Sequence, residues 1–515
     1  MGTTASENRF FDDGDKHEFD PEKWTGNSPS GQPKRAPETN LSILIVGAGL
    51  SGLMAALECW RKGHNVIGIL ERNKGPNYHG DLIIIQPSAI AAFRHYPDMV
   101  RELEEDRLTA QTYYYRHDGE LVYGPSEPAF NDSEFEKQRQ DWPKVGAMQM
   151  RKKFYRMLLR QVARIGLKVE YDQRVDRYFE DEAAGLGGVV LQSGEVRTAN
   201  TIIAADAFKS RSQLLITGVY TKPKPTGVSV YRAAFSSAEA FKDEKVWERW
   251  GKGREAHEFW LGQGMHLGVY CSPDTLAFGL TPRNELLPPN SAVAKESWDP
   301  DVDPEEVVQV LRSMPGWEPS IEALVRKAPR GNLIHWPLLW RDLQPEWTSK
   351  GGHVVQVGDA AHATMPTSTA GGTLAIEDVV TLASCLQLSC FGSGTAGARL
   401  GAKIYNLLRH QRVSCTQKMA FVNSQVLNAT TDWDAVRADP QSVRLRYPRW
   451  LFGHDPEAYA YEKYGQAFAH LLGGAAFHNT NIPPGYTFVP WTIDEVHGDM
   501  AQGKRLEELL EGDWS

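Results

Sequence analysis

The sequence predicts an α/β fold with a parallel sheet at its centre, and three observations lead to this prediction. A β-branched run at Leu41–Val46 is followed at once by glycines and then by a helical stretch. A second strand-like run, Asn65–Leu70, ends in an acidic residue. Much further along the chain, the run His353–Val357 leads through a Gly-Asp pair towards another helical stretch. Short apolar strands that alternate with helices are typical of parallel sheets covered on both faces.

The glycines after the first strand have the spacing GxGxxG, over Gly47–Gly52. Between a strand and a helix, this pattern indicates a dinucleotide-binding turn. We expect Gly47 to allow a tight turn, Gly49 to let a pyrophosphate approach the backbone, and Gly52 to let helix and strand pack closely. The free N–H groups at the start of the helix would then face the phosphates.

Glu71, at the end of the second strand, lies 19 residues after Gly52. At this distance a carboxylate can accept hydrogen bonds from the ribose hydroxyls of an adenosine. Both NAD and FAD satisfy the motif. It therefore predicts a bound dinucleotide without choosing between the two.

The third motif begins at Gly358-Asp359 and continues through Pro366 to Gly371-Gly372. A carboxylate at the end of a buried strand needs a partner, and the ribityl chain of FAD would supply one for Asp359. The glycines leave room for a flat ring, and their amides can face its carbonyl edge. Apolar residues then recur at helical spacing from about Thr373 to Leu388. This motif favours FAD over NAD.

With these motifs in this order, the chain resembles the class A flavoprotein monooxygenases, the family of para-hydroxybenzoate and salicylate hydroxylases. Three further segments are similar to that family. Gly80–Ala89 resembles the segment after the second strand, Arg151 matches an arginine that reaches the FAD phosphates, and Thr201–Arg211 resembles a Gly-Ala-Asp-Gly-x-x-Ser stretch. The resemblance extends from about residue 41 to residue 425.

The resemblance implies a Rossmann-like FAD-binding domain with an inserted β-sheet substrate domain, followed by a mostly helical C-terminal extension. The expected segments are a flexible arm (1–40), a first FAD-binding part (41–220, of which 121–144 contributes to the substrate side), a substrate domain (221–334), a second FAD-binding part (335–425) and the extension (426–515). The residues expected to contact FAD are Gly47, Ala48, Gly49, Ser51, Gly52, Glu71, Arg72, Gly80, Arg151, Val175, Asp206, Gly358, Asp359, Pro366, Gly371 and Gly372.

The family also implies a reaction. NADPH or NADH would reduce the flavin during a transient visit, and the reduced flavin would react with O2 to give a C4a-hydroperoxide. One oxygen atom would then enter an aromatic, phenolic or salicylate-like small molecule, typical of secondary metabolism. In such chemistry the cofactor carries the difficult step, while the protein orients the substrate and excludes water. A flavin-dependent epoxidase or indole oxidase is the alternative, and a non-catalytic binding protein with the same fold is a more distant one.

The chain departs from the family pattern in two places. Ala204 and Ala207 stand where the family has glycine, in a stretch associated with both FAD and the nicotinamide donor. Thr369-Ala370-Gly371-Gly372 stands where many members carry Gly-Gln-Gly. We therefore expect an altered loop beside the reactive edge of the flavin.

Three residues are candidates for contact with the substrate: Lys209, Tyr231 and Arg232. Because Tyr231 and Arg232 are neighbours in a strand-like run, they should point to opposite faces, so we expect only one of them to meet the substrate. We interpret His95 and His362 as histidines satisfied by backbone groups. Eight of the fifteen tryptophans fall between Trp247 and Trp347, where they either line a cavity or fill the core.

Composition excludes several other classes of protein. A net charge of −9 argues against a nucleic-acid partner. Five cysteines without CxxC spacing indicate reduced thiols and a cytoplasmic location, and no metal-ligand cluster is visible. The apolar stretch Leu41–Trp60 contains the glycine motif, so we expect no integral membrane segment. We expect a monomer or a homodimer.

Overall fold

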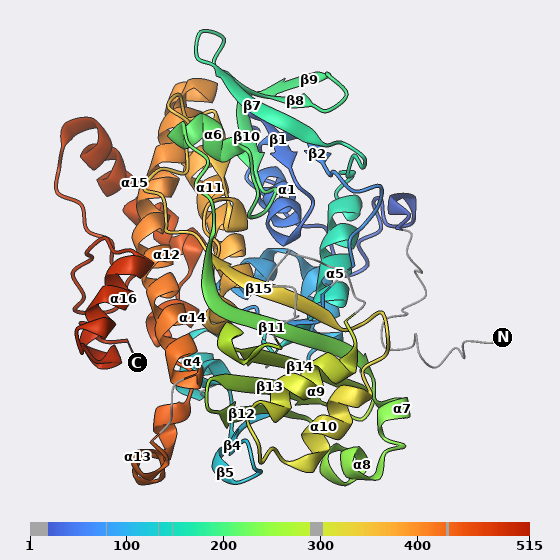
Figure 1. Ribbon diagram of the computed structural model, residues 1–515. Helices are drawn as coiled ribbons and strands as arrows, with labels where there is room; N and C mark the ends of the chain where they lie inside the picture. The colour runs from blue at the N-terminus through green and yellow to red at the C-terminus, as the bar shows by residue number, and fades with distance from the viewer. Residues whose placement is uncertain are drawn as a thin grey trace.

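The computed structural model describes residues 19–78, 80–131, 133–146, 148–288, 302–428 and 432–514. Its elements form two main layers, with a parallel sheet in the upper half of Figure 1 and a larger mixed sheet in the lower half. The predicted α/β fold is confirmed.

The parallel sheet has the strand order β16-β10-β1-β2. Its strands are β1 (Ser42–Val46), β2 (Asn65–Leu70), β10 (Thr201–Ala204) and β16 (Val354–Gln356). On one face lies the largest apolar core, to which α1 (Leu50–Arg61), α11 (Gly371–Ser393) and α12 (Ala398–Asn428) contribute. On the other face lie the antiparallel strands β7 (Val175–Asp181), β8 (Leu186–Leu191) and β9 (Val196–Ala199). Burial on both faces explains the nearly continuous apolar runs of these short strands.

The second sheet has seven strands in the order β15-β11-β14-β13-β12-β4-β5. They are β4 (Gln111–Arg116), β5 (Leu121–Ser126), β11 (Lys224–Ser236), β12 (Ala256–Gly262), β13 (Met265–Cys271), β14 (Thr275–Pro282) and β15 (Ile334–Trp340). The sheet therefore extends beyond the expected limits of 221–334 at both ends. One face packs on α8 (Glu244–Trp250), α9 (Pro304–Arg312) and α10 (Pro319–Arg326), and the other faces the layer that contains the parallel sheet, which we call the FAD-binding layer after the expectation from sequence.

The other helices and short strands are distributed over both layers. They are β3 (Leu82–Ile83), β6 (Gln149–Met150), α2 (Pro87–Ile90), α3 (Pro97–Glu105), α4 (Ser133–Gln138), α5 (Arg151–Arg164), α6 (Ser212–Thr217) and α7 (Ser237–Ala240). The C-terminal extension is mostly helical and contains α13 (Trp433–Ala438), α14 (Arg449–Phe452), α15 (Pro456–Gly473) and α16 (Ile493–Ala501). In Figure 1 it lies outside α11 and α12.

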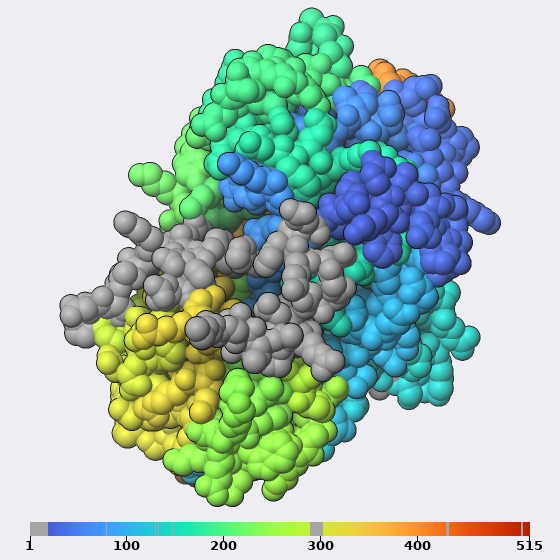
Figure 2. Space-filling model, turned by 90° about the vertical axis from the view of Figure 1, so that its right-hand side faces the viewer, coloured from blue at the N-terminus to red at the C-terminus, as the bar shows by residue number. Residues whose placement is uncertain are grey.

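The described part of the N-terminal arm, residues 19–40, is held more firmly than we expected. The N–H of Gly26 donates to the carbonyl of Arg164 (3.1 Å), and the N–H of Ala36 donates to that of Arg61 (2.8 Å). Trp24 lies under the guanidinium of Arg164 at 5.1 Å. Figure 2 shows these dark-blue residues lying against the rest of the FAD-binding layer. Residues 1–18 lie outside the described residues.

One helical run, Gly371–Asn428, is long and apolar enough to cross a membrane, which we did not anticipate. Its most apolar window is 89% buried inside the protein. A helix that is apolar on every side is typical of a protein core as well as of a membrane. The run is therefore explained as the central helical layer against the parallel sheet.

Candidate active site

The fold brings the first and third motifs to the same edge of the parallel sheet. Strand β10 pairs with β1 on one side and with β16 on the other, so Gly47–Gly52 and Gly358-Asp359 follow strands two places apart. A Cβ atom added at Gly358 would lie 3.2 Å from the hydroxyl oxygen of Ser51. Two segments far apart in the sequence therefore lie side by side, and we call the space next to them the cofactor cleft.

The three glycines of the first motif differ in what surrounds them. Gly47 has φ +101°, and a Cβ there would lie 2.3 Å from the carbonyl oxygen of Ala205. A Cβ on Gly52 would lie 1.8 Å from the carbonyl oxygen of Gly47, whereas a Cβ on Gly49 would meet nothing within 4 Å. Gly47 and Gly52 are thus required by the turn and the packing. Gly49 leaves open space at the start of α1, where a pyrophosphate fits.

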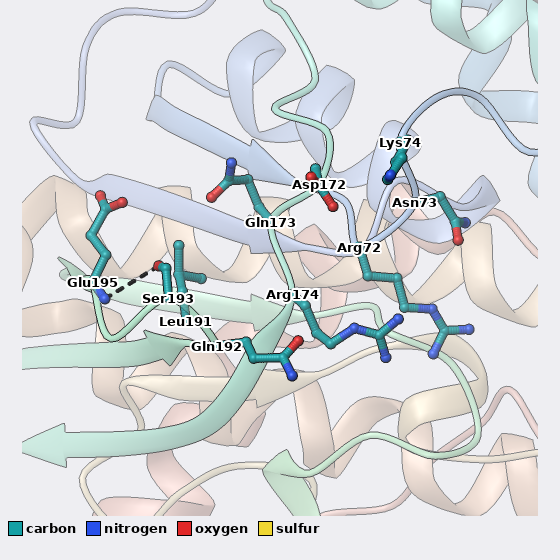
Figure 3. A pocket seen from close by; sticks show the side chains of 10 residues that line it. All are labelled: Arg72, Asn73, Lys74, Asp172, Gln173, Arg174, Leu191, Gln192, Ser193 and Glu195. Atoms are coloured by element: carbon teal, nitrogen blue, oxygen red, sulfur yellow. Dashed lines mark hydrogen bonds between the residues drawn. The ribbon is translucent and has the colours of Figure 1, made fainter.

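Glu71 lies directly beside the glycine turn. Its carboxylate accepts hydrogen bonds from the N–H groups of Ala48 and Asn73, both at 2.9 Å. The next residue, Arg72, lines a polar cavity of about 630 Å³ together with Lys74 and Arg174. In Figure 3 the side chains of Arg72 and Arg174 extend in the same direction. One fixed carboxylate and several cations, from the segment after β2 and from Arg174 just before β7, therefore lie near the glycine turn.

Asp359 is exposed to solvent even though protein surrounds it on several sides. Burial raises the pKa of its carboxyl, and the nearby His362 and Arg341 oppose this effect. A carboxyl that solvent can reach, but that protein surrounds on several sides, is expected where a side chain faces an internal cleft. Hydroxyl groups of a ribityl chain would satisfy it there.

A buried network of charges supports the loop that carries Asp359. Asp378 in α11 accepts a hydrogen bond from the N–H of Gly358 (2.9 Å) and contacts Nε2 of His362 (2.5 Å). Arg409 in α12 donates to Asp378 (2.8 Å) and to Glu377 (2.7 Å). Helix α12 thereby fixes the loop through α11, an arrangement that the sequence motifs did not predict.

Four further residues that we expect to contact FAD have the following surroundings. Gly80 has φ +116° and makes room for Arg151, since a Cβ there would lie 2.4 Å from Cδ of Arg151. Asp206 accepts a hydrogen bond from the hydroxyl of Tyr178 at 2.8 Å, and burial raises the pKa of its carboxyl. Val175 begins β7, on the sheet that includes Tyr178.

The start of α11 closes the cleft on the side of the second sheet. The helix begins at Gly371, and a Cβ on Gly372 would lie 2.6 Å from Cδ1 of Ile85. The preceding turn contains Pro366 and Thr369, which line a second cavity. A side chain at position 372 would therefore have to displace the tip of Ile85.

This second cavity, of about 260 Å³, lies between the cofactor cleft and the seven-stranded sheet. We refer to it as the substrate cavity. The sheet contributes residues of five strands to it, which are Val230, Arg232, His257, Phe259, His266, Gly268, Tyr270, Ala277, Phe278, Gly279, Thr281 and Leu338. The FAD-binding layer contributes residues 81–84 and the turn at 366–369.

Comparison with known proteins identifies the family. The family described as FAD binding domain matches residues 40–418. The chain is 57% identical to the FAD-dependent monooxygenase AacuC of Aspergillus aculeatus over 511 residues, which cover 98% of this chain and 99% of the relative. The chain belongs to the class A flavoprotein monooxygenases. FAD is therefore its cofactor, and the protein is an FAD-dependent monooxygenase.

Solved structures show the same fold. The monooxygenase is similar to FqzB with a TM-score of 0.74 and 24% identity, over 88% of this chain and 99% of that one. It is similar to a salicylate hydroxylase with a TM-score of 0.63 and 18% identity, over 82% of this chain and 98% of that one. The open space at Gly49 and the exposed carboxyl of Asp359 fit FAD on the evidence of this structure alone.

Arg232 of the monooxygenase lines the substrate cavity, as expected for one of the two neighbours in β11. Its Nε atom lies 3.3 Å from Oδ2 of Asp81, in an ion pair across the cavity wall. Burial raises the pKa of Asp81, and the nearby Arg232 and Arg151 oppose this effect. Asp81 follows Gly80 in a segment that was singled out for FAD, yet the sequence gave no reason to assign this carboxylate to the substrate side.

Tyr231 lies on the opposite face of the sheet, and the expectation that it contacts the substrate needs correction. It is fully buried, and its hydroxyl donates to Glu306 in α9 at 2.6 Å. Its ring stacks on His335 at 4.2 Å. The alternation of side chains along β11 causes this separation from Arg232.

The expectation that Lys209 contacts the substrate also needs correction. Lys209 is exposed in the loop after β10 and is not among the residues that line the substrate cavity. His95 and His362 are satisfied by carboxylates rather than by the backbone groups that we expected, with His95 Nε2 at 2.8 Å from Glu457. Of the tryptophans in the described residues, none lines the substrate cavity, and Trp250 and Trp260 fill the core behind the sheet.

Two histidines that the sequence analysis missed face the substrate cavity. Burial lowers the pKa of both His257 and His266 to about 4, so both are neutral near pH 7. Nδ1 of His266 lies 2.7 Å from Oδ1 of Asn428. The alternation of side chains in His257-Glu258-Phe259 and in His266-Leu267-Gly268 indicates that each strand has two distinct faces. The alternation does not indicate which face meets the cofactor.

Proposed function

We propose that the enzyme inserts one oxygen atom from O2 into a phenolic or salicylate-like aromatic molecule bound in the substrate cavity, with NADPH or NADH as electron donor. The placement of Arg232 carries this proposal. Among the described residues that line the cavity, it alone has a permanent positive charge. A guanidinium there can bind a phenolate or a carboxylate through charge-assisted hydrogen bonds.

The surrounding side chains support an electron-rich substrate. A cation beside the phenol stabilises its phenolate form, which donates more electron density to the ring. Asp81, whose pKa is raised, lies within 3.3 Å of Arg232 and is placed to receive the phenolic proton. The neutral imidazoles of His257 and His266 can exchange hydrogen bonds with a ligand without adding charge. Phe259 and Phe278 provide apolar walls that exclude water.

When bound, FAD would supply the redox chemistry that activates O2, with NADPH or NADH as the source of two electrons. The overall reaction consumes the substrate C–H bond, O2, NAD(P)H and one proton. It gives the hydroxylated product, water and NAD(P)⁺. The protein's own contribution is to orient the ring, to hold the phenolate oxygen at Arg232 and to keep solvent from the cavity.

Labelled oxygen tests the proposal. Wild-type holoenzyme is incubated with NADPH, ¹⁸O2 and a panel of phenolic, salicylate-like and olefinic compounds, and the products are analysed by mass spectrometry. We expect one ¹⁸O atom in a hydroxylated phenol. Arg232→Met should lower product formation by about 10-fold or more, because it removes a charge-assisted hydrogen bond. Arg330→Met, at a side chain that is 84% exposed, is the matched control.

Other products would contradict the proposal. An epoxide from the olefinic compounds, with no labelled phenol, would assign the enzyme to the epoxidases instead. A product that takes its oxygen from water would exclude monooxygenation of these compounds. Unchanged turnover in Arg232→Met would remove this arginine from the substrate site.

We also propose that the enzyme works in the cytoplasm. All five cysteines are free and buried, which suits a reducing compartment. Cell fractionation tests this, and recovery of the enzyme from an oxidising compartment would contradict it.

A further inference from the structure

Two glycines lie side by side in the floor of the substrate cavity, in the middle of the seven-stranded sheet. Gly268 in β13 pairs with Gly279 in β14. From β11, Arg232 pairs with Gly279, and from β12, Phe259 pairs with Gly268. One row across four strands therefore reads Arg232, Gly279, Gly268, Phe259, and all four residues line the cavity.

Both glycines face the cavity rather than the core behind the sheet. Their neighbours Leu267 and Leu280 are fully buried in the core formed with α8, α9 and α10. Since side chains alternate along a strand, a side chain at position 268 or 279 would point into the cavity. A Cβ added at either position would meet nothing within 4 Å.

Nothing in the described protein requires glycine at these two positions. Neither residue has a positive φ angle. By contrast, Gly262 in β12 is explained by packing, since a Cβ there would lie 2.4 Å from Cε of Met314. Glycine in the interior of a strand weakens it and often marks a place where a ligand approaches the backbone closely. Two paired glycines with open space above them therefore indicate a surface shaped for a ligand.

We infer that Gly268 and Gly279 form the floor of a slot for a planar aromatic substrate of two or more fused rings, bounded by Arg232 on one side and Phe259 on the other. This inference rests on the proposed function. It adds that the glycine pair determines the size of the substrate. The cavity of about 260 Å³ supports it, because a cavity of roughly 150 Å³ already accommodates a single benzene ring. Arg232 would hold the acidic edge of the ring system while its face lies on bare backbone.

The test adds one methyl group to the floor, in Gly268→Ala and in Gly279→Ala holoenzyme. Binding of salicylate, 1-hydroxy-2-naphthoate and 3-hydroxyanthracene-2-carboxylate is measured from the change in flavin absorbance. We expect affinity for the two- and three-ring compounds to fall by about tenfold or more, as overpacking predicts, and affinity for salicylate to change by less than about threefold. The melting temperature should stay the same or rise, because alanine restricts the unfolded chain.

Gly465→Ala is the matched control, since Gly465 is exposed in α15 and a Cβ there would also meet nothing within 4 Å. It should leave all three affinities unchanged. No change in affinity, or the same fold-change for every ring size in the floor variants, would overturn the inference, as would loss of bound FAD, which would assign the slot to the flavin. Failure of the wild type to hydroxylate any phenol would refute the proposed function instead, because selectivity by ring size is measured by binding alone.

Discussion

Two residues beside the cofactor cleft have left-handed backbone conformations although they are not glycines. Ala207 has φ +67° and Thr369 has φ +50°. By resemblance, Ala207 stands where the related family has glycine, and Thr369 begins the segment that stands where many members carry Gly-Gln-Gly. Gln86 Nε2 donates to the carbonyl of Thr369 (3.2 Å), and Ser210 N–H donates to that of Ala207 (3.0 Å). The backbone is thus left-handed at both positions, as glycine favours, and the altered loop that we expect at 369–372 stays a prediction.

Ala207→Gly should stabilise the protein. A left-handed conformation costs a residue with a Cβ roughly 1–2 kcal/mol, and glycine loses about 0.5–1 kcal/mol more backbone entropy on folding. The difference predicts a gain of about 0.5–1 kcal/mol in the free energy of unfolding, measured by urea denaturation. A loss of stability would show that the methyl group of Ala207 makes a favourable contact that outweighs the strain.

At the scale of single elements, α11 and α12 are joined by fully buried charges. Arg412 donates to both oxygens of Glu377 at 2.8 and 2.9 Å, and to the carbonyl of Leu451 in the C-terminal extension at 2.7 Å. Burial by itself raises the pKa of Glu377, but the adjacent Arg412 and Arg409 outweigh it and hold that pKa below its ordinary value. The same network reaches Asp378 and the cofactor loop. It therefore connects the extension to the FAD site.

Arg412→Met should destabilise the protein by about 3–5 kcal/mol, because it leaves part of a buried carboxylate charge without its partner. Denaturant titration measures the loss. Arg399→Met is the matched control in the same helix, since Arg399 is exposed, and its effect should stay within about 0.5 kcal/mol. Equal effects of the two substitutions would contradict a stabilising role for the network.

At the scale of the whole molecule, four neutral histidines lie at junctions between layers. Burial lowers the pKa values of His64, His257, His266 and His410 to about 4 each. Nδ1 of His64 lies 2.7 Å from the hydroxyl of Thr39 in the N-terminal arm, and its Nε2 lies 3.1 Å from the carbonyl of Ala383 in α11. Protonation of such residues would weaken contacts that connect the arm, the sheets and the helices.

The melting temperature should therefore fall as the pH is lowered from about 6.5 to 4. The unfolded chain has histidine pKa values near 6.5 and binds protons first, so the contribution of these histidines is complete above that pH and is lost towards pH 4. Differential scanning fluorimetry across this range measures the effect. A constant melting temperature between pH 6.5 and 4.5 would contradict it.

Features that depend on residues close together in the sequence could be predicted from it, whereas features that depend on contacts between distant segments could not. Gly47–Gly52, Glu71 and Asp359 could be found because each depends on a strand and the few residues after it. The sequence could predict that Arg232 and Tyr231 point to opposite faces of β11. It could not predict which of them meets the substrate, because this depends on which face of β11 meets the FAD-binding layer. The pairing of β4 with β12, which widens the second sheet, joins residues far apart in sequence and leaves no local pattern.

The central claim is that one FAD molecule is held between the turn at Gly47–Gly52 and the carboxylate of Asp359. The FAD dissociation constants of the wild type and Asp359→Ala, measured by fluorescence titration of the apoprotein, test it most directly. Asp434→Ala, at a side chain that is 97% exposed, is the control. We predict that Asp359→Ala weakens FAD binding by about 10- to 100-fold, the loss expected for hydrogen bonds to a charged group, while the apoprotein stays folded. An unchanged dissociation constant in a folded Asp359→Ala protein would contradict the claim.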